Sequence, residues 1–118
     1  MNFRLKGWLM SQLQDLIDAF EKETKDIIAR NKRTIIDNVP EAALYEQLGE
    51  EAAELAHACF KKSRAIRGEN PTPVSSEEAS INVCEELTDV HVASFVLGLS
   101  KDPRLFFEKI SRWADRLS

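Results

Sequence analysis

The fold is decided by residues 44–59, LYEQLGEEAAELAHAC, and residues 79–97, ASINVCEELTDVHVASFVL. In both stretches apolar residues recur every three or four positions, which is typical of an amphipathic α-helix. The first seam consists of Leu44, Leu48, position 51, Leu55 and Cys59, and the second of Ala79, Val83, position 86, Val90, Ala93 and Leu97. The periodicity predicts two helices that pack along these seams.

The same helical spacing continues over most of the chain, and only four glycines and four prolines interrupt it. No stretch alternates in the manner of a strand, so we predict an all-α fold, an antiparallel bundle of about four helices. A chain of 118 residues is long enough for one domain and too short for two. We expect helices over residues 7–31, 40–68, 75–99 and 103–117.

Local signals support these boundaries. Pro40 suits the first turn of a helix because its φ is already helical and its missing N–H is not needed there. Segment 68–76, GENPTPVSS, has no helical periodicity, and Ser75 with Glu78 three residues later has the spacing of a capping box. Asp102 precedes a proline, which predicts a capped helix start.

The first predicted helix has a single apolar stripe, and its charged remainder is expected to face water. The stripe consists of Leu9, Leu13, Leu16, Phe20 and Ile27.

The composition excludes some functions. Hydrophobic residues make up 43% and charged residues 31% of the chain, and the net charge is −4 without a basic stripe. A protein that grips nucleic acid polymers needs such a stripe, so we do not expect that partner. Residues 1–10 lack the pattern of a signal peptide and no apolar run reaches about 18 residues, so we expect a cytoplasmic protein without a membrane segment.

The two cysteines, Cys59 and Cys84, lie inside helical patterns and lack the CxxC spacing of a zinc site. We expect both to be buried thiols rather than metal ligands or partners in a disulfide.

Each seam is interrupted by a carboxylate, Glu51 in the first and Glu86 in the second. An unpaired ionised carboxylate in an apolar seam is costly, so two of them imply either raised pKa values or a neutralising cation. Each has an acidic companion three residues later on the same helix face, Glu54 and Asp89. These four hard oxygen ligands favour Mg²⁺, or Mn²⁺, completed by waters and substrate phosphates.

Acidic pairs at this spacing are also common on solvated helix faces. Asp15, Asp18 and Glu21 have the same spacing, but they lie off the apolar stripe of their helix. The position of Glu51 and Glu86 on their seams is therefore what favours a metal site.

Other charged residues complete the predicted site. Glu50 and Glu85, each just before a ligand, could orient ligands or accept a proton from water. Lys61 lies seven residues after Glu54, about 10 Å along the same helix face, and Arg64 follows it. Positive charge at this distance suits a triphosphate bridged to the metal.

Glu50-Glu51-Ala-Ala-Glu54 followed by Glu86-Leu-Thr-Asp89 resembles the EExxE and ExxD pair of the MazG-like all-α nucleoside triphosphate pyrophosphohydrolases, particularly the small phage-type members. The resemblance covers residues 35–117, which would be the catalytic helices of the single domain, and leaves residues 1–34 outside as an extra N-terminal helix. The surrounding residues that carry it are Lys61, Arg64, the Asn-Pro-Thr at 70–72, Asn82, Arg112, Trp113 and Arg116. The interval between the two acidic motifs is longer than usual in the family. This difference affects the expected details of the substrate pocket and leaves the expected metal site unchanged.

The resemblance implies a Mg²⁺-dependent enzyme that hydrolyses a nucleoside triphosphate to the monophosphate and pyrophosphate, as in the house-cleaning of nucleotide pools. It also implies a homodimer or higher homo-oligomer whose sites draw on more than one subunit. In such an enzyme Lys61 and Arg64 hold phosphates, while Asn82, Arg112, Trp113 and Arg116 contact the nucleotide.

Two other readings stay open. Glu54-Leu-Ala-His57 is a Glu-x-x-His step of the kind found in di-iron carboxylate bundles. Such bundles need the step twice, and His91 lies on a different face from Asp89. The second alternative is a non-catalytic bundle, an interaction or regulatory protein whose apolar first helix packs against a partner.

Overall fold

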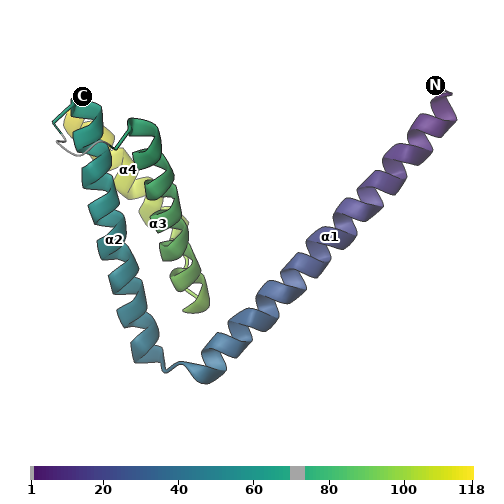
Figure 1. The fold of residues 1–118 in the computed structure, drawn as a ribbon, viewed down its shortest axis with the longest axis horizontal. Helices are drawn as coiled ribbons and strands as arrows, with labels where there is room; N and C mark the ends of the chain where they lie inside the picture. Colours follow the sequence, from purple (N-terminus) through teal and green to yellow (C-terminus); the bar gives the residue numbers. More distant parts are fainter. Residues whose placement is uncertain (1, 70–73) are drawn as a thin grey trace. The chain divides into compact units, whose positions relative to one another are not determined.

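The computed structural model describes residues 2–69 and 74–118, so the Asn-Pro-Thr at 70–72 lies outside the described residues. Within those ranges the chain is all-helical and no strand is found, which confirms the predicted fold class. The helices are α1 (Phe3–Asn38), α2 (Glu41–Arg67), α3 (Ser76–Val96) and α4 (Pro103–Leu117) (Figure 1). The chain divides into two compact units, Met1–Val39 and Pro40–Ser118, which are described separately.

The first unit is the single long helix α1, and it extends beyond the predicted range 7–31 at both ends. At its start the side chain of Asn2 accepts a hydrogen bond from the Arg4 N–H at 3.1 Å, an N-cap that the prediction overlooked. At its end, Val39 adopts an extended conformation (φ −123°, ψ 125°). This is the conformation favoured before a proline, so Pro40 is what stops the helix.

The ends of α2 and α3 follow from local chemistry. Pro40 is the N-cap of α2 rather than its first residue, and Gly68 closes the helix in the left-handed region at φ 69°. The Ser75 hydroxyl accepts from the Glu78 N–H at 3.1 Å, which confirms the predicted cap of α3. This helix ends at Val96, before the predicted 99, because Gly98 takes a positive φ of 73°.

The last helix, α4, has the predicted bounds. The Asp102 carboxylate accepts hydrogen bonds from the N–H groups of Arg104 and Leu105 at 2.9 and 3.0 Å. A proline at the first helical position completes this start.

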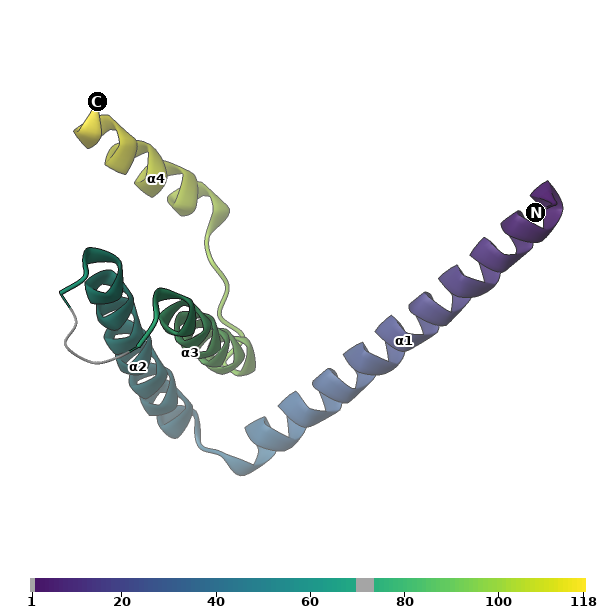
Figure 2. The ribbon, with the colours of Figure 1, turned by 45° about the horizontal axis from the view of Figure 1, so that its top comes forward.

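Helices α2 and α3 lie side by side (Figures 1 and 2). The Lys62 ammonium near the end of α2 donates to the carbonyl and hydroxyl oxygens of Ser76, the first residue of α3, at 2.9 and 2.5 Å. The Glu51 carboxylate, earlier in α2, meets that of Glu86, later in α3, so the two helices run antiparallel. Of the described residues, three are buried, Ala58, Ala79 and Val96. Ala58 occupies the seam position that had been predicted for Cys59.

The predicted burial of the cysteines is wrong, since both Cys59 and Cys84 are exposed free thiols. For Cys59 the reason is the rotation of about 100° between successive residues of an α-helix. Because Ala58 faces α3, the side chain of Cys59 points away from it.

No helix within the described ranges is both long and apolar enough to cross a membrane.

Candidate functional site

Three of the four predicted metal ligands come together. Glu51 and Glu54 on α2 and Glu86 on α3 each offer a carboxylate oxygen, and these oxygens lie within 4.8 Å of one another. Glu51 and Glu86 are half-buried because they occupy seam positions between apolar residues, whereas Glu54 is exposed one turn further along α2. The antiparallel packing of two predicted seams thus creates a cluster of negative charge.

Two oxygens of this cluster have no hydrogen-bond donor. In the described part of the chain, Oε2 of Glu51 and Oε2 of Glu86 are buried without a partner. The other oxygen of Glu51 accepts a 2.6 Å hydrogen bond from the side-chain amide of Gln47, one turn earlier. Buried carboxylate oxygens are normally satisfied by a proton, a water or a cation, and one cation could satisfy both of these atoms at once.

The pKa of Glu86 is raised above its ordinary value of 4.5. Burial is the largest cause, followed by a hydrogen bond with Glu54 and by the negative charges of Glu54, Asp89 and Glu51. The cluster without a cation therefore tends to retain a proton, and a divalent cation would reverse this tendency.

The fourth predicted ligand, Asp89, is exposed and lies outside the group of three. Its negative charge nevertheless raises the pKa of Glu86 from one turn further along α3. Asp89 therefore belongs to the electrostatic surroundings of the cluster.

A cavity of about 330 Å³ opens beside the acidic cluster. It is lined by Glu54, Ala58, Lys61, Val74, Ala79, Asn82 and Glu86. The cavity thus brings an ammonium group and a side-chain amide to the same space as two of the carboxylates. A ligand there would meet negative charge at one end and hydrogen-bond donors at the other, which suits a phosphate chain carrying a metal ion.

Other predicted site residues lie outside this cavity. Glu50, Glu85 and Arg64 are exposed and do not line it. The backbone carbonyl of Arg64 accepts hydrogen bonds from the N–H groups of Gly68 and Glu69, so this residue also closes α2.

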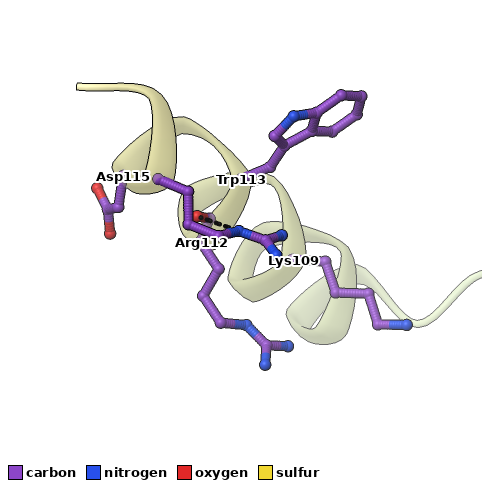
Figure 3. A pocket seen from close by; sticks show the side chains of 5 residues that line it. Lys109, Arg112, Trp113 and Asp115 are labelled. Carbon is purple, nitrogen blue, oxygen red and sulfur yellow. Dashed lines mark hydrogen bonds between the residues drawn. The ribbon is translucent and has the colours of Figure 1, made fainter.

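Arg112, Trp113 and Arg116 belong to α4, where they line a hollow of about 610 Å³ together with Lys109 and Asp115. The Arg116 Nε donates to the backbone carbonyl of Arg112 at 3.4 Å. Figure 3 shows the Trp113 ring and the Asp115 carboxylate projecting from α4 in different directions. The three predicted nucleotide contacts thus line one hollow of α4, and Glu51, Glu54 and Glu86 do not line it.

The histidines of the di-iron alternative do not join the carboxylates. His57 is exposed and is not part of the group formed by Glu51, Glu54 and Glu86. His91 lines a different hollow, together with Lys101.

The structure adds site residues that the sequence prediction missed. Gln47 lies four residues before Glu51, a spacing at which side chains on a helix meet, so this partner could have been found. Ala58, Val74 and Ala79 shape the cavity without any chemical signature of their own.

Comparison with known proteins gave no relatives: the chain matches no protein-family model, no curated protein and no solved structure.

Proposed function

We propose that this protein is a Mg²⁺-dependent nucleoside triphosphate pyrophosphohydrolase. The observation that carries the proposal is the pair of buried, unpartnered oxygens of Glu51 and Glu86 beside a cavity that contains Lys61. Unpartnered buried carboxylates call for a cation, and their oxygen chemistry favours Mg²⁺ or Mn²⁺. The resemblance of the two acidic motifs to the MazG-like family supports the same reaction.

The metal ligands in this proposal are Glu51, Glu54 and Glu86, and Asp89, one turn further along α3, is the candidate for a fourth carboxylate or for binding a coordinated water. When bound, Mg²⁺ would draw charge off the phosphates and lower the pKa of a bound water. The seam residues around Glu51 and Glu86 hold these carboxylates in place, and Gln47 orients Glu51 through its 2.6 Å hydrogen bond.

The remaining residues would bind the substrate. Lys61 would neutralise phosphate oxygens and Asn82 would donate a hydrogen bond from the same cavity. Attack of water at the α-phosphorus breaks its bond to the bridging oxygen, so the products are the nucleoside monophosphate and pyrophosphate. Glu50 and Glu85 are the candidates for accepting the proton of that water.

The Arg64 guanidinium and the α4 residues Arg112, Trp113 and Arg116 complete the proposed substrate contacts. All four side chains are exposed. The guanidinium groups suit a phosphate, and the indole ring of Trp113 suits a nucleotide base. The proposed active form is a homodimer or higher homo-oligomer.

The test is a panel of ribo- and deoxyribonucleoside triphosphates with Mg²⁺, in which pyrophosphate and phosphate are measured separately. We expect pyrophosphate and no phosphate. Glu54→Gln and Asp89→Asn should each abolish turnover with the helical circular dichroism spectrum unchanged, because one carboxylate fewer weakens the hold on the cation. Glu46→Gln, an exposed glutamate of α2 outside the cluster, is the matched control and should retain full activity. Full activity of the Glu54 or Asp89 variant would refute the metal assignment.

A second candidate function is favoured by α1, whose apolar stripe is exposed. A non-catalytic interaction protein would have this feature and would release no pyrophosphate from any nucleotide in the panel. The same experiment therefore separates the two functions.

A further inference from the structure

The helix α1 has a regular seam, apolar at five of its eight positions, that is exposed along its length. It consists of Met10, Leu13, Ile17, Phe20, Thr24, Ile27, Asn31 and Thr34, alternately three and four residues apart. None of the residues in Phe3–Asn38 is buried, and Leu13 and Phe20 are 51% and 71% exposed. Spacing of this kind is the seam of a coiled coil, in which each side chain packs against a second helix.

The polar members of the seam are compatible with burial. The Thr24 hydroxyl donates to the Phe20 carbonyl at 2.9 Å, and the Thr34 hydroxyl donates to the Arg30 carbonyl at 3.1 Å. Both hydroxyl hydrogens are therefore satisfied within α1, and covering them would leave no unpaired donor.

Polar side chains beside the seam are paired within the helix. Gln14 donates to Asp18 at 2.9 Å, and Arg33 forms an ion pair with Asp37 at 3.1 Å. These pairs need no partner molecule, so the seam is the side of α1 that calls for one.

We propose that α1 pairs with α1 of a second copy of this chain, as a parallel coiled coil in register. In this arrangement Thr24 meets Thr24 and Asn31 meets Asn31, so every polar layer faces a polar layer. A single asparagine in such a seam is the established way to fix register. The two antiparallel registers with nearly full overlap instead place Leu13 opposite Thr24 or Asn31 of the other copy.

The charges beside the seam agree with the parallel arrangement. In a parallel coiled coil, the residue just before Ile17, Thr24 or Asn31 lies close to the residue five places later in the sequence of the other copy. Glu23 and Arg30 then face Ile28 and Ile35 of the other copy, and no like charges are opposed.

The first test is the mass of the full chain by sedimentation equilibrium, for which we expect twice 13.4 kDa. Ile17 in the seam and Ile36 outside it are 42% and 41% exposed on the same helix, which makes them a matched pair. Ile17→Lys places two ammonium groups against each other and should give a monomer, whereas Ile36→Lys should remain a dimer. A monomeric wild type, as expected if α1 instead packs on its own chain, would overturn the proposal, and so would equal masses for the two variants.

The second test keeps the seam intact and determines the orientation. In a background with Cys59→Ala and Cys84→Ala, oxidation of Thr24→Cys should give a covalent dimer, because residue 24 meets itself only in the parallel register. Lys22→Cys, on the polar side of α1, should remain monomeric on a non-reducing gel. Absence of the cross-link at position 24 would overturn the parallel arrangement even if Ile17→Lys fails to fold. Neither readout depends on nucleotide hydrolysis.

Discussion

Replacement of Glu51 by leucine tests whether this carboxylate is held in the α2–α3 seam at a cost to stability. Glu51 is half-buried, and its Oε2 has no hydrogen-bond donor among the described residues. Leucine would continue the seam of Leu48 and Leu55 with a side chain of suitable size. Without metal, we therefore expect Glu51→Leu to be more stable than the wild type.

The magnitude follows from two contributions. Half-burial of a leucine side chain contributes roughly 1 kcal/mol, which is half the lower range for full burial. Removal of a buried oxygen without a partner contributes about 1 kcal/mol or more. A gain of about 2 kcal/mol should raise the melting temperature by roughly 10 °C for a unit of this size.

The assay is thermal unfolding followed by circular dichroism at one fixed protein concentration, first with EDTA and then with Mg²⁺. Magnesium at 100 times its Kd should stabilise the wild type by about 2.7 kcal/mol and should leave Glu51→Leu unchanged. The difference in melting temperature between Glu51→Leu and the wild type should therefore shrink or change sign when Mg²⁺ is added.

The control is Glu46→Leu, which changes an exposed glutamate of the same helix and should shift stability by no more than about 0.5 kcal/mol. If Glu51→Leu melts at or below the wild-type temperature in EDTA, Glu51 is solvated and the argument for a cation fails.

The raised pKa of Glu86 means that the folded chain binds a proton more tightly than the unfolded chain, so metal-free stability should fall as pH rises from 4.5 through the raised pKa. Glu86→Gln should flatten this dependence in melts with EDTA; an unchanged pH profile would contradict the assignment. Lys61→Ala should raise the KM for the triphosphate at least tenfold, since a hydrogen bond to a charged group is worth roughly 1.5–3 kcal/mol, and Lys25→Ala on α1 should not. Gly68→Ala should lower stability by about 1 kcal/mol because the φ of Gly68 is 69°. Gly49→Ala should raise stability by about 0.5–1 kcal/mol, because Gly49 lies mid-helix with open space around it. Denaturant unfolding that ranks the two variants the other way would refute the backbone argument.

Much of the α2–α3 pair could be predicted because helical periodicity determines which residues share a face. The spacing identified Glu51 and Glu86 as interruptions of two seams, and these are the two residues with buried, unpartnered oxygens. It also grouped Lys61 with Glu54, and both line one cavity. These relations depend only on the geometry of a helix.

The rest depends on information that a repeat does not contain. The N-cap of α1 depends on one side chain, Asn2, and the end of α3 on the positive φ of Gly98. The rotation of α2 about its own axis determines which of two adjacent residues faces α3, and here Ala58 is buried and Cys59 is exposed. Distances across the pair, such as that of Asp89 from the other carboxylates, depend on how closely the helices approach.

That approach is set by two of the smallest side chains. Ala58 and Ala79 are buried between α2 and α3 and also line the cavity beside the carboxylates. Their methyl groups set the distance between the two helices, and with it the separation of Glu51 and Glu86 two helical turns away. If the cluster binds Mg²⁺ as proposed, residues that do not touch the ion would thus influence which ion fits, and a bulkier residue in place of either alanine should shift the preference toward larger cations such as calcium.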